Sequence, residues 1–165
     1  MKKSFSFLMS CAIAMSGLTC SAAVADYDGE TALANAKADI TNWMKYLPDD
    51  MFAAHVSIPG SHDSATGHNV SIPSMSMAQE VLLEDQLKGG IRAFDFRPGF
   101  YSKTETIDGE EVTTYYINCN HGASKTEITM EDAFTILSDY LKEHPSEFFA
   151  IHLFVRSYRG HKRQL

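Results

Sequence analysis

The chain has 165 residues, which is long enough for one domain with its own hydrophobic core. Acidic residues outnumber basic ones by 21 to 14, and the formal net charge is −7 at pH 7. We therefore expect no nucleic-acid partner, because binding to a phosphate backbone needs clustered Lys and Arg.

The first 25 residues have the pattern of a secretory signal peptide. Two lysines at positions 2 and 3 precede an apolar stretch from Phe5 to Leu18, and Ala23-Val24-Ala25 offers an A-x-A cleavage site. We therefore predict a secreted or periplasmic protein whose residues 26–165 form the folded part. Lipoprotein anchoring at Cys20 is the less favoured alternative, because Gly-Leu-Thr before it is a poor lipidation context.

Cysteine usage predicts a fold without disulfides. Cleavage at this site removes Cys11 and Cys20, so that only Cys119 remains, and an intrachain disulfide is not expected. Loss of the two leader lysines also takes the net charge to −9.

Hydrophobic periodicity predicts alternating helices and strands in the first half of the folded part. In chain order we expect a helix over 31–47, a short strand over 55–58, a helix over 75–88 and a strand over 91–97. Pro48, Pro59-Gly60 and Gly89-Gly90 are the breaks between them.

The second half begins with an inserted hairpin over 100–118, for which Asp108-Gly109 is the turn signal. Thr129 is expected to cap a helix that ends before Pro145. The last element is an apolar strand over 148–155, interrupted by His152, and its composition predicts burial on both faces.

This alternation predicts an α/β fold with a mostly parallel sheet covered by helices. About four parallel strands would be half of an eight-stranded barrel, which typically takes ~250 residues. We therefore expect a TIM-barrel-like fold, the N-terminal half of a (β/α) barrel, apparently truncated. A small open sheet is the alternative.

Polar residues gather where three of the predicted strands end. These stretches are Gly60-Ser61-His62-Asp63, Phe94-Asp95-Phe96-Arg97-Pro98-Gly99 and Asn118-Cys119-Asn120-His121-Gly122. Because ligands bind at the carboxyl ends of parallel strands, two histidines, an arginine and two aspartates are expected to converge. Taken singly, each has a structural explanation, such as an Asx turn at Asp63 or an ion pair between Asp95 and Arg97.

Two histidines and an arginine suit the cleavage of a phosphodiester. One imidazole can take a proton from an attacking hydroxyl and the other can protonate the leaving oxygen, while a guanidinium binds the phosphoryl oxygens. The alternative is a Zn²⁺ or Mn²⁺ site built from His62, Asp63, Asp95 and His121. Arg97 argues against it, because a fixed cation disfavours a second one.

Four stretches carry a resemblance to a known family. The segments "SIPGSHDSATG", "LKGGIRAFDFRPG", "NHG" and "PSEFFAIHL" resemble the catalytic X region of bacterial phosphatidylinositol-specific phospholipase C, over residues 42–155. The resemblance implies a TIM-like barrel and a metal-independent cleavage of phosphatidylinositol at a membrane surface. The products would be diacylglycerol and inositol 1,2-cyclic phosphate.

The resemblance also implies a role for each polar residue. His62 matches the general base, His121 the general acid and Arg97 the phosphate-binding arginine, which stands where calcium-dependent relatives hold a metal ion. Asp63 matches the acid that couples the base to Arg97 and His121, and Asp95 matches a supporting aspartate. No cofactor or metal is expected.

This sequence departs from the family pattern in what it omits. The aspartate that orients the base histidine, and residues that bind inositol, come from the second half of the family barrel. Two other hypotheses therefore stay open: a metal-dependent glycerophosphodiester phosphodiesterase, and a catalytically incomplete barrel fragment that serves as a binding module. The head group of the phosphodiester substrate and the oligomeric state are also left open.

Overall fold

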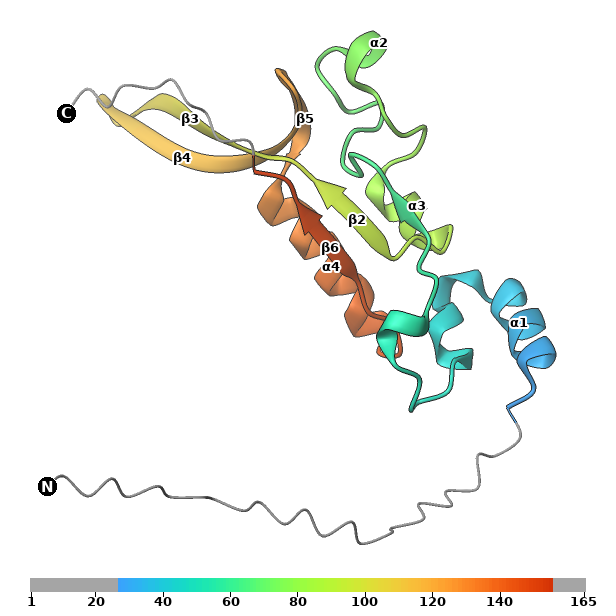
Figure 1. Cartoon of the computed structure of the whole chain (residues 1–165). Coiled ribbons are helices and arrows are strands. Elements are labelled where there is room, and N and C mark those ends of the chain that lie inside the picture. The colour runs from blue at the N-terminus through green and yellow to red at the C-terminus, as the bar shows by residue number, and fades with distance from the viewer. Residues whose placement is uncertain (1–26, 156–165) are drawn as a thin grey trace, which may run out of the picture.

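The structure is a computed structural model, and it describes residues 27–155 (Figure 1). The predicted signal peptide, residues 1–25, lies outside the described residues. In chain order the elements are α1 (Gly29–Ala38), the 3-10 helices η1 (Ile40–Tyr46) and η2 (Ala53–His55), β1 (Gly60–Ser61), α2 (Pro73–Ser76), α3 (Leu83–Lys88), β2 (Ala93–Phe96), β3 (Pro98–Ile107), β4 (Glu110–His121), β5 (Ser124–Thr129), α4 (Met130–Glu143) and β6 (Ala150–Leu153).

The strands form two sheets of different kinds. A parallel sheet has the order β1-β2-β6, and an antiparallel sheet has the order β3-β4-β5. In the parallel sheet Gly60 pairs with Ala93, and Asp95 pairs with His152. The predicted mixture of helices and a parallel sheet is therefore present, and the three parallel strands come from distant parts of the sequence.

The first predicted strand was misplaced. Part of residues 55–58 belongs to η2, and pairing with β2 begins only at Gly60. The carbonyl of Pro59 accepts hydrogen bonds from the backbone N–H groups of Arg92 and Ala93, at 2.9 and 3.0 Å. The parallel ladder therefore starts at the Pro-Gly break, whereas the sequence pattern predicts that the strand ends there.

Both of the first two predicted helices are divided in the structure. The helix expected over 31–47 is split into α1 and η1 at Asp39, whose φ of −130° and ψ of 67° are not helical. The helix expected over 75–88 is split into α2 and α3. Here the N–H groups of Ala78 and Gln79 donate to the carbonyl of Thr66, which removes them from a helical hydrogen-bond ladder.

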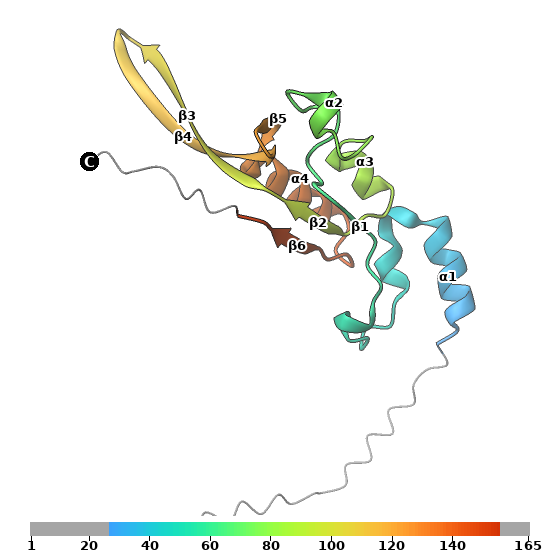
Figure 2. The same ribbon diagram turned by 45° about the horizontal axis from the view of Figure 1, so that its top comes forward.

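The strand that ends in Asn118–Gly122 is not part of the parallel sheet. It is β4, which pairs antiparallel with β3 from Pro98↔Cys119 to Ile107↔Glu110. Only Arg97 separates β2 from β3, so the chain continues straight past the parallel sheet before it reverses. The predicted turn is confirmed, since Asp108 and Gly109 both have the positive φ, 52° and 87°, of a tight hairpin. Figure 2 shows the resulting long ribbon, which extends away from the helices.

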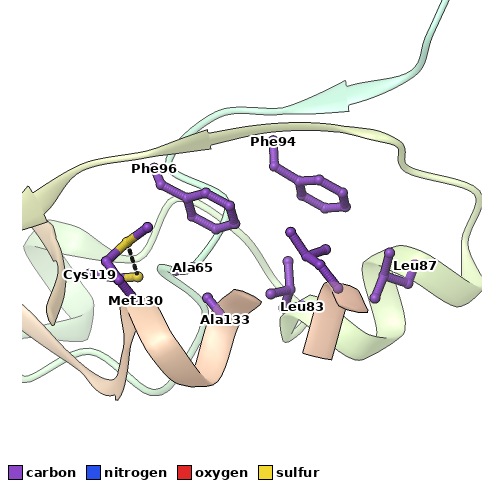
Figure 3. Close-up of a cluster of buried hydrophobic side chains, with 9 residues drawn as sticks. Ala65, Leu83, Leu87, Phe94, Phe96, Cys119, Met130 and Ala133 are labelled. Atoms are coloured by element: carbon purple, nitrogen blue, oxygen red, sulfur yellow. Dashed lines mark hydrogen bonds between the residues drawn. The ribbon is translucent and has the colours of Figure 1, made fainter. Parts of the chain in front are cut away.

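The hydrophobic core lies on one face of β2. Phe94 and Phe96 point from this strand toward α3 and the start of α4, as Figure 3 shows. Their partners include Leu83, Leu87 and Ala133. Side chains alternate along a strand, so Asp95 is directed to the opposite face. Burial of the two phenylalanines thereby fixes the direction in which the acidic side chain points.

The start of α4 was predicted correctly, and the burial of the last strand was not. Thr129 forms a reciprocal capping box with Asp132 at the start of α4. All four residues of β6, in contrast, are exposed, and Ile151 and Leu153 are 40% and 47% accessible. Within residues 27–155 this strand pairs only with β2, along one edge. In the same range, no helix is long and apolar enough to cross a bilayer.

Candidate active site

A cleft opens where β1, β2 and β6 end. It has a volume of about 460 Å³. The residues that line it lie at or just after the ends of these three strands, at the start of β3 and at the end of β4. They are His62, Asp95, Arg97, Pro98, Asn120, Gly122, His152 and Phe154. The antiparallel sheet thus adds one wall, because Pro98 lies in β3 and Asn120 lies in β4.

Asp63 lies at the centre of the polar cluster. Its side chain is fully buried, and its carboxylate contacts Arg97 Nε at 2.5 Å, His121 Nε2 at 3.2 Å and His62 Nε2 at 3.4 Å. Three of the other four residues predicted for the site therefore contact the carboxylate of Asp63. A φ of 47° turns Asp63 back toward the cleft directly after β1.

His62 is held by both of its ring nitrogens. Nδ1 lies 2.9 Å from Asp95 Oδ2, and Nε2 lies 3.1 Å from a terminal guanidinium nitrogen of Arg97. A guanidinium can only donate, so Nε2 must be the acceptor, which leaves the proton on Nδ1 for the bond to Asp95. In this tautomer Nε2 carries the lone pair that a general base requires, and Arg97 is its neighbour in the structure.

Asp95 joins His62 to a histidine that was not among the predicted site residues. Its second oxygen, Oδ1, lies 3.0 Å from Nδ1 of His152, which is its register partner on β6. The signal for His152 was present in the sequence, as the only ionisable residue in an apolar strand. It could not be interpreted there, because the adjacency of β2 and β6 is a property of the fold.

The two aspartates differ in their pKa values. Burial raises the pKa of Asp63, although the charges of Arg97, His121 and His62 act in the opposite direction. Burial also acts to raise the pKa of Asp95, but the hydrogen bond from His152, together with smaller contributions from neighbouring groups, outweighs it, so that this pKa is lowered. Asp95 is therefore the more readily ionised carboxylate of the pair.

Arg97 lies between Asp63 and the aromatic ring of Phe154. Its Nε is engaged by Asp63, and its guanidinium lies 5.7 Å from the centre of the Phe154 ring, within the range of a cation–π contact. Two partners of different kinds therefore fix the plane of the guanidinium. Such a group can bind two phosphoryl oxygens at once.

A metal ion could find donors here, although the arginine competes with it. Ligand atoms of His62, Asp63 and Asp95 lie within 4.8 Å of one another. Asp63 already contacts the guanidinium of Arg97, so a cation placed between the carboxylates would face a fixed positive charge. The donor set therefore fits an arginine-based site better than a divalent ion.

Comparison with known proteins gives a fold relationship. No family model matches the sequence. A phosphatidylinositol-specific phospholipase C from Staphylococcus aureus that contains pentafluoro-phenylalanine matches 77% of this chain, with 22% identity and a TM-score of 0.57. A double mutant of the enzyme from S. aureus matches 73% of it, with 24% identity and a TM-score of 0.55.

This chain spans 40% and 38% of the lengths of those two structures. The similarity confirms the predicted fold class, an α/β chain that forms part of a TIM-like barrel. At this level of identity it speaks for the fold alone, and the chemistry rests on the side chains of the site.

Proposed function

We propose that the protein cleaves a phosphodiester in phosphatidylinositol or a related inositol phospholipid. The observation that carries the proposal is the gathering of Arg97, His62 and His121 around the buried carboxylate of Asp63. This set supplies a base, an acid and a cationic phosphate ligand without a metal ion. The similarity of fold to phosphatidylinositol-specific phospholipase C supports the choice of lipid.

The proposed reaction is an internal displacement at phosphorus. His62 Nε2 takes the proton of the inositol 2-hydroxyl, whose oxygen forms a bond to phosphorus. The bond between phosphorus and the glycerol oxygen breaks, and His121 supplies the proton to that oxygen. The products are inositol 1,2-cyclic phosphate and diacylglycerol. Arg97 binds the non-bridging oxygens and offsets the charge that they gain in the transition state.

Asp63 organises this reaction without taking part in proton transfer. Its contacts with both imidazoles and with Arg97 hold the three groups on one side of the cleft. After proton transfer the imidazolium of His62 lies 3.4 Å from this carboxylate, which stabilises the new charge. One buried acid therefore serves both halves of the proposed reaction.

Localisation and domain organisation complete the proposal. We expect residues 1–25 to direct export and to be removed, so that residues 26–165, as the N-terminal part of a barrel, act on lipid outside the cytoplasm. The substrate is then presented at a membrane surface.

The test uses the purified chain and vesicles that contain phosphatidylinositol. We expect ³¹P NMR to show release of inositol 1,2-cyclic phosphate, and His62→Ala and His121→Ala each to reduce the rate by at least 10²-fold, in line with the typical size of acid–base catalysis. His55→Ala is the matched control, because His55 is exposed in η2 and does not line the cleft. A folded wild-type protein that releases nothing would instead favour the non-catalytic binding module.

Chelation separates the proposal from its metal-dependent competitor. EDTA should leave the rate unchanged, since Arg97 occupies the position at which a cation would act. Complete loss of activity on chelation, with recovery on addition of Mn²⁺ or Zn²⁺, would overturn the proposal. The donor triad His62, Asp63 and Asp95 would then be assigned to a metal-dependent phosphodiesterase.

A further inference from the structure

We propose that His152 is a positioning residue of this site, which holds Asp95 and, through Asp95, the imidazole of His62. The inference rests on the proposed function, because it assigns His62 the role of base. Its foundation is geometric. The two oxygens of Asp95 lie 2.9 and 3.0 Å from the Nδ1 atoms of His62 and His152, so that one carboxylate joins two imidazoles.

The sheet sets the distance between Asp95 and His152. They are register partners in the parallel pairing of β2 with β6, which runs from Ala93↔Ala150 to Phe96↔Leu153. Figures 1 and 2 show these strands side by side. Phe94 and Phe96 are buried on the opposite face of β2 and prevent rotation of the strand. Backbone pairing therefore sets the spacing between the two residues, while the His152 side chain itself is 70% exposed.

Asp95 needs a second donor in order to hold His62 in one orientation. Its backbone N–H donates to Ser64 Oγ at 2.8 Å, which anchors the main chain, and its Oδ2 accepts only a long bond of 3.4 Å from the backbone N–H of Asp63. The shorter bond from His152 Nδ1 to Oδ1, at 3.0 Å, restricts rotation of the carboxylate further and keeps Oδ2 directed toward His62. His62 is 65% exposed on its side chain, so packing alone does not fix its ring.

The same bond determines which nitrogen of His62 carries the proton. With Oδ2 fixed beside Nδ1, the proton stays on Nδ1, and Nε2 remains unprotonated next to Arg97. A carboxylate free to turn away would allow the other tautomer, in which Nε2 is protonated and cannot act as a base. His152 in β6 thus positions Asp95 in β2, and Asp95 positions His62 after β1.

The kinetic test compares two substitutions at one position. His152→Ala removes the donor and should lower kcat about tenfold to hundredfold, the range expected when a reacting group is misplaced, with KM unchanged. His152→Asn places an amide nitrogen near the position of Nδ1 and should restore most of the rate. His55→Ala again serves as the control. A raised KM with an unchanged kcat would overturn the proposal, since His152 would then contact substrate directly.

A spectroscopic test does not depend on activity. In ¹⁵N NMR of the imidazoles, wild-type His62 should show the Nδ1–H tautomer, and His152→Ala and Asp95→Asn should each shift it toward a mixture of tautomers. His152→Asn should retain the wild-type signal. Identical His62 signals in wild type and His152→Ala would overturn the proposal. If wild type shows no cleavage but the tautomer still shifts, the proposed function fails and the positioning role stands.

Discussion

Asp63 combines a strained backbone, complete burial and three polar partners. Its φ of 47° lies in the left-handed region, which Asp and Asn enter more readily than other residues with a side chain. Its carboxylate is enclosed with Arg97 and two histidines. Burial raises its pKa, which means that the ionised form is less favourable in the folded chain than in the unfolded one. The proposed function and the stability of the fold therefore make opposite demands on this residue.

Asp63→Asn should raise thermal stability at pH 7 while it abolishes activity. Asparagine tolerates the same φ and has nearly the same shape, so the substitution mainly removes the cost of burying a charge. We expect a Tm above that of wild type, because burial disfavours the ionised carboxyl of Asp63 in the folded chain. Calorimetry at pH 7 measures it, and a lower Tm than that of wild type would contradict it.

The direction of each pKa shift also predicts how the stability difference between variant and wild type changes with pH. A carboxyl whose folded pKa is raised destabilises the fold above that pKa, and the effect disappears as pH falls toward the unfolded value of about 4. The gain in Tm of Asp63→Asn over wild type should therefore shrink toward pH 4.

Asp95 has a lowered pKa, so Asp95→Asn should reduce Tm at pH 7, and this loss should shrink below about pH 4.

Cys119 should be unreactive in the folded protein. Its thiol is buried beside the sulfur of Met130, at 3.2 Å, and burial raises its pKa to about 12. The thiolate is the nucleophile, so alkylation at pH 8 requires local opening. Peptide mapping after treatment with iodoacetamide should find Cys119 unmodified in the native protein and modified in urea. Rapid modification of the native protein would show that β4 does not pack as described.

At the scale of elements, the junction of β3 and β4 shapes the cleft through a glycine. A Cβ added to Gly99 would lie 2.1 Å from Nδ2 and 2.9 Å from Cγ of Asn120, so this side chain fills the space that any larger residue would need. Asn120 also lines the cleft, and its backbone N–H donates to the carbonyl of Arg97 at 2.9 Å. The glycine thereby links strand packing to the position of two site residues.

Gly99→Ala should impair catalysis more than stability. The methyl group must displace Asn120 toward the cleft, beside His121 and Arg97, and we expect kcat/KM to fall about tenfold to hundredfold. Gly29→Ala is the matched control, because a Cβ there meets only Tyr27 at an ordinary 3.6 Å. Wild-type activity in Gly99→Ala would show that Asn120 can move away without disturbing its neighbours.

The helices and strands show which local structures the sequence pattern can predict. Short-range signals were sufficient for the hairpin turn at Asp108-Gly109 and for the cap at Thr129, since both depend on neighbours in sequence. Patterns did not show the division of the helix over 75–88, because Thr66, distant in sequence, accepts hydrogen bonds from its N–H groups. The exposure of β6 was missed for the same reason, as burial depends on which elements pack against a strand.

In the candidate site, too, contacts between segments distant in sequence could not be read from the pattern. The structure brings together all five predicted residues. Four of them meet because residues that leave the adjacent strands β1 and β2 share one edge of the fold. His121 arrives by a different path from the one expected, on an antiparallel strand. His152 could be recognised only from the register of β2 with β6. The sequence thus predicted which residue types meet in the cleft, while strand pairing determined the second partner of Asp95.

At the scale of the whole molecule, a buried ion pair ties together segments distant in sequence. Arg92 and Glu147 have no exposed side-chain surface, and Arg92 Nε lies 2.6 Å from Glu147 Oε2. The guanidinium also donates to the carbonyls of Leu87 and Thr41 and to the hydroxyl of Tyr140. Arg92 thereby joins η1, α3 and α4 immediately before β2. Glu147, shortly before β6, accepts a hydrogen bond from the backbone N–H of Met44 in η1 at 2.9 Å.

Breaking this pair should destabilise the fold and disturb the site at a distance. Arg92→Met leaves Glu147 buried without a counter-charge, and the loss of one member of a buried pair costs about 3–5 kcal/mol. Urea denaturation should show a large fall in midpoint for Arg92→Met, and Lys142→Met, which breaks the exposed Lys142–Asp139 contact, should show little change. Similar midpoints for the two variants would contradict a stabilising role for the pair.

The consequence for the site follows from where the pair lies. Arg92 and Glu147 stand at the entry to the two strands whose register places Asp95 beside His152. Glu147→Gln keeps the shape and the hydrogen-bond capacity but removes the charge, so we expect a partly destabilised yet folded variant. Its His62 should show the mixed tautomers predicted for His152→Ala in ¹⁵N NMR, because a loosened β2–β6 register lengthens the bond to Asp95. A wild-type His62 signal in a measurably destabilised Glu147→Gln would show that the register near the cleft is held locally, by the strands themselves.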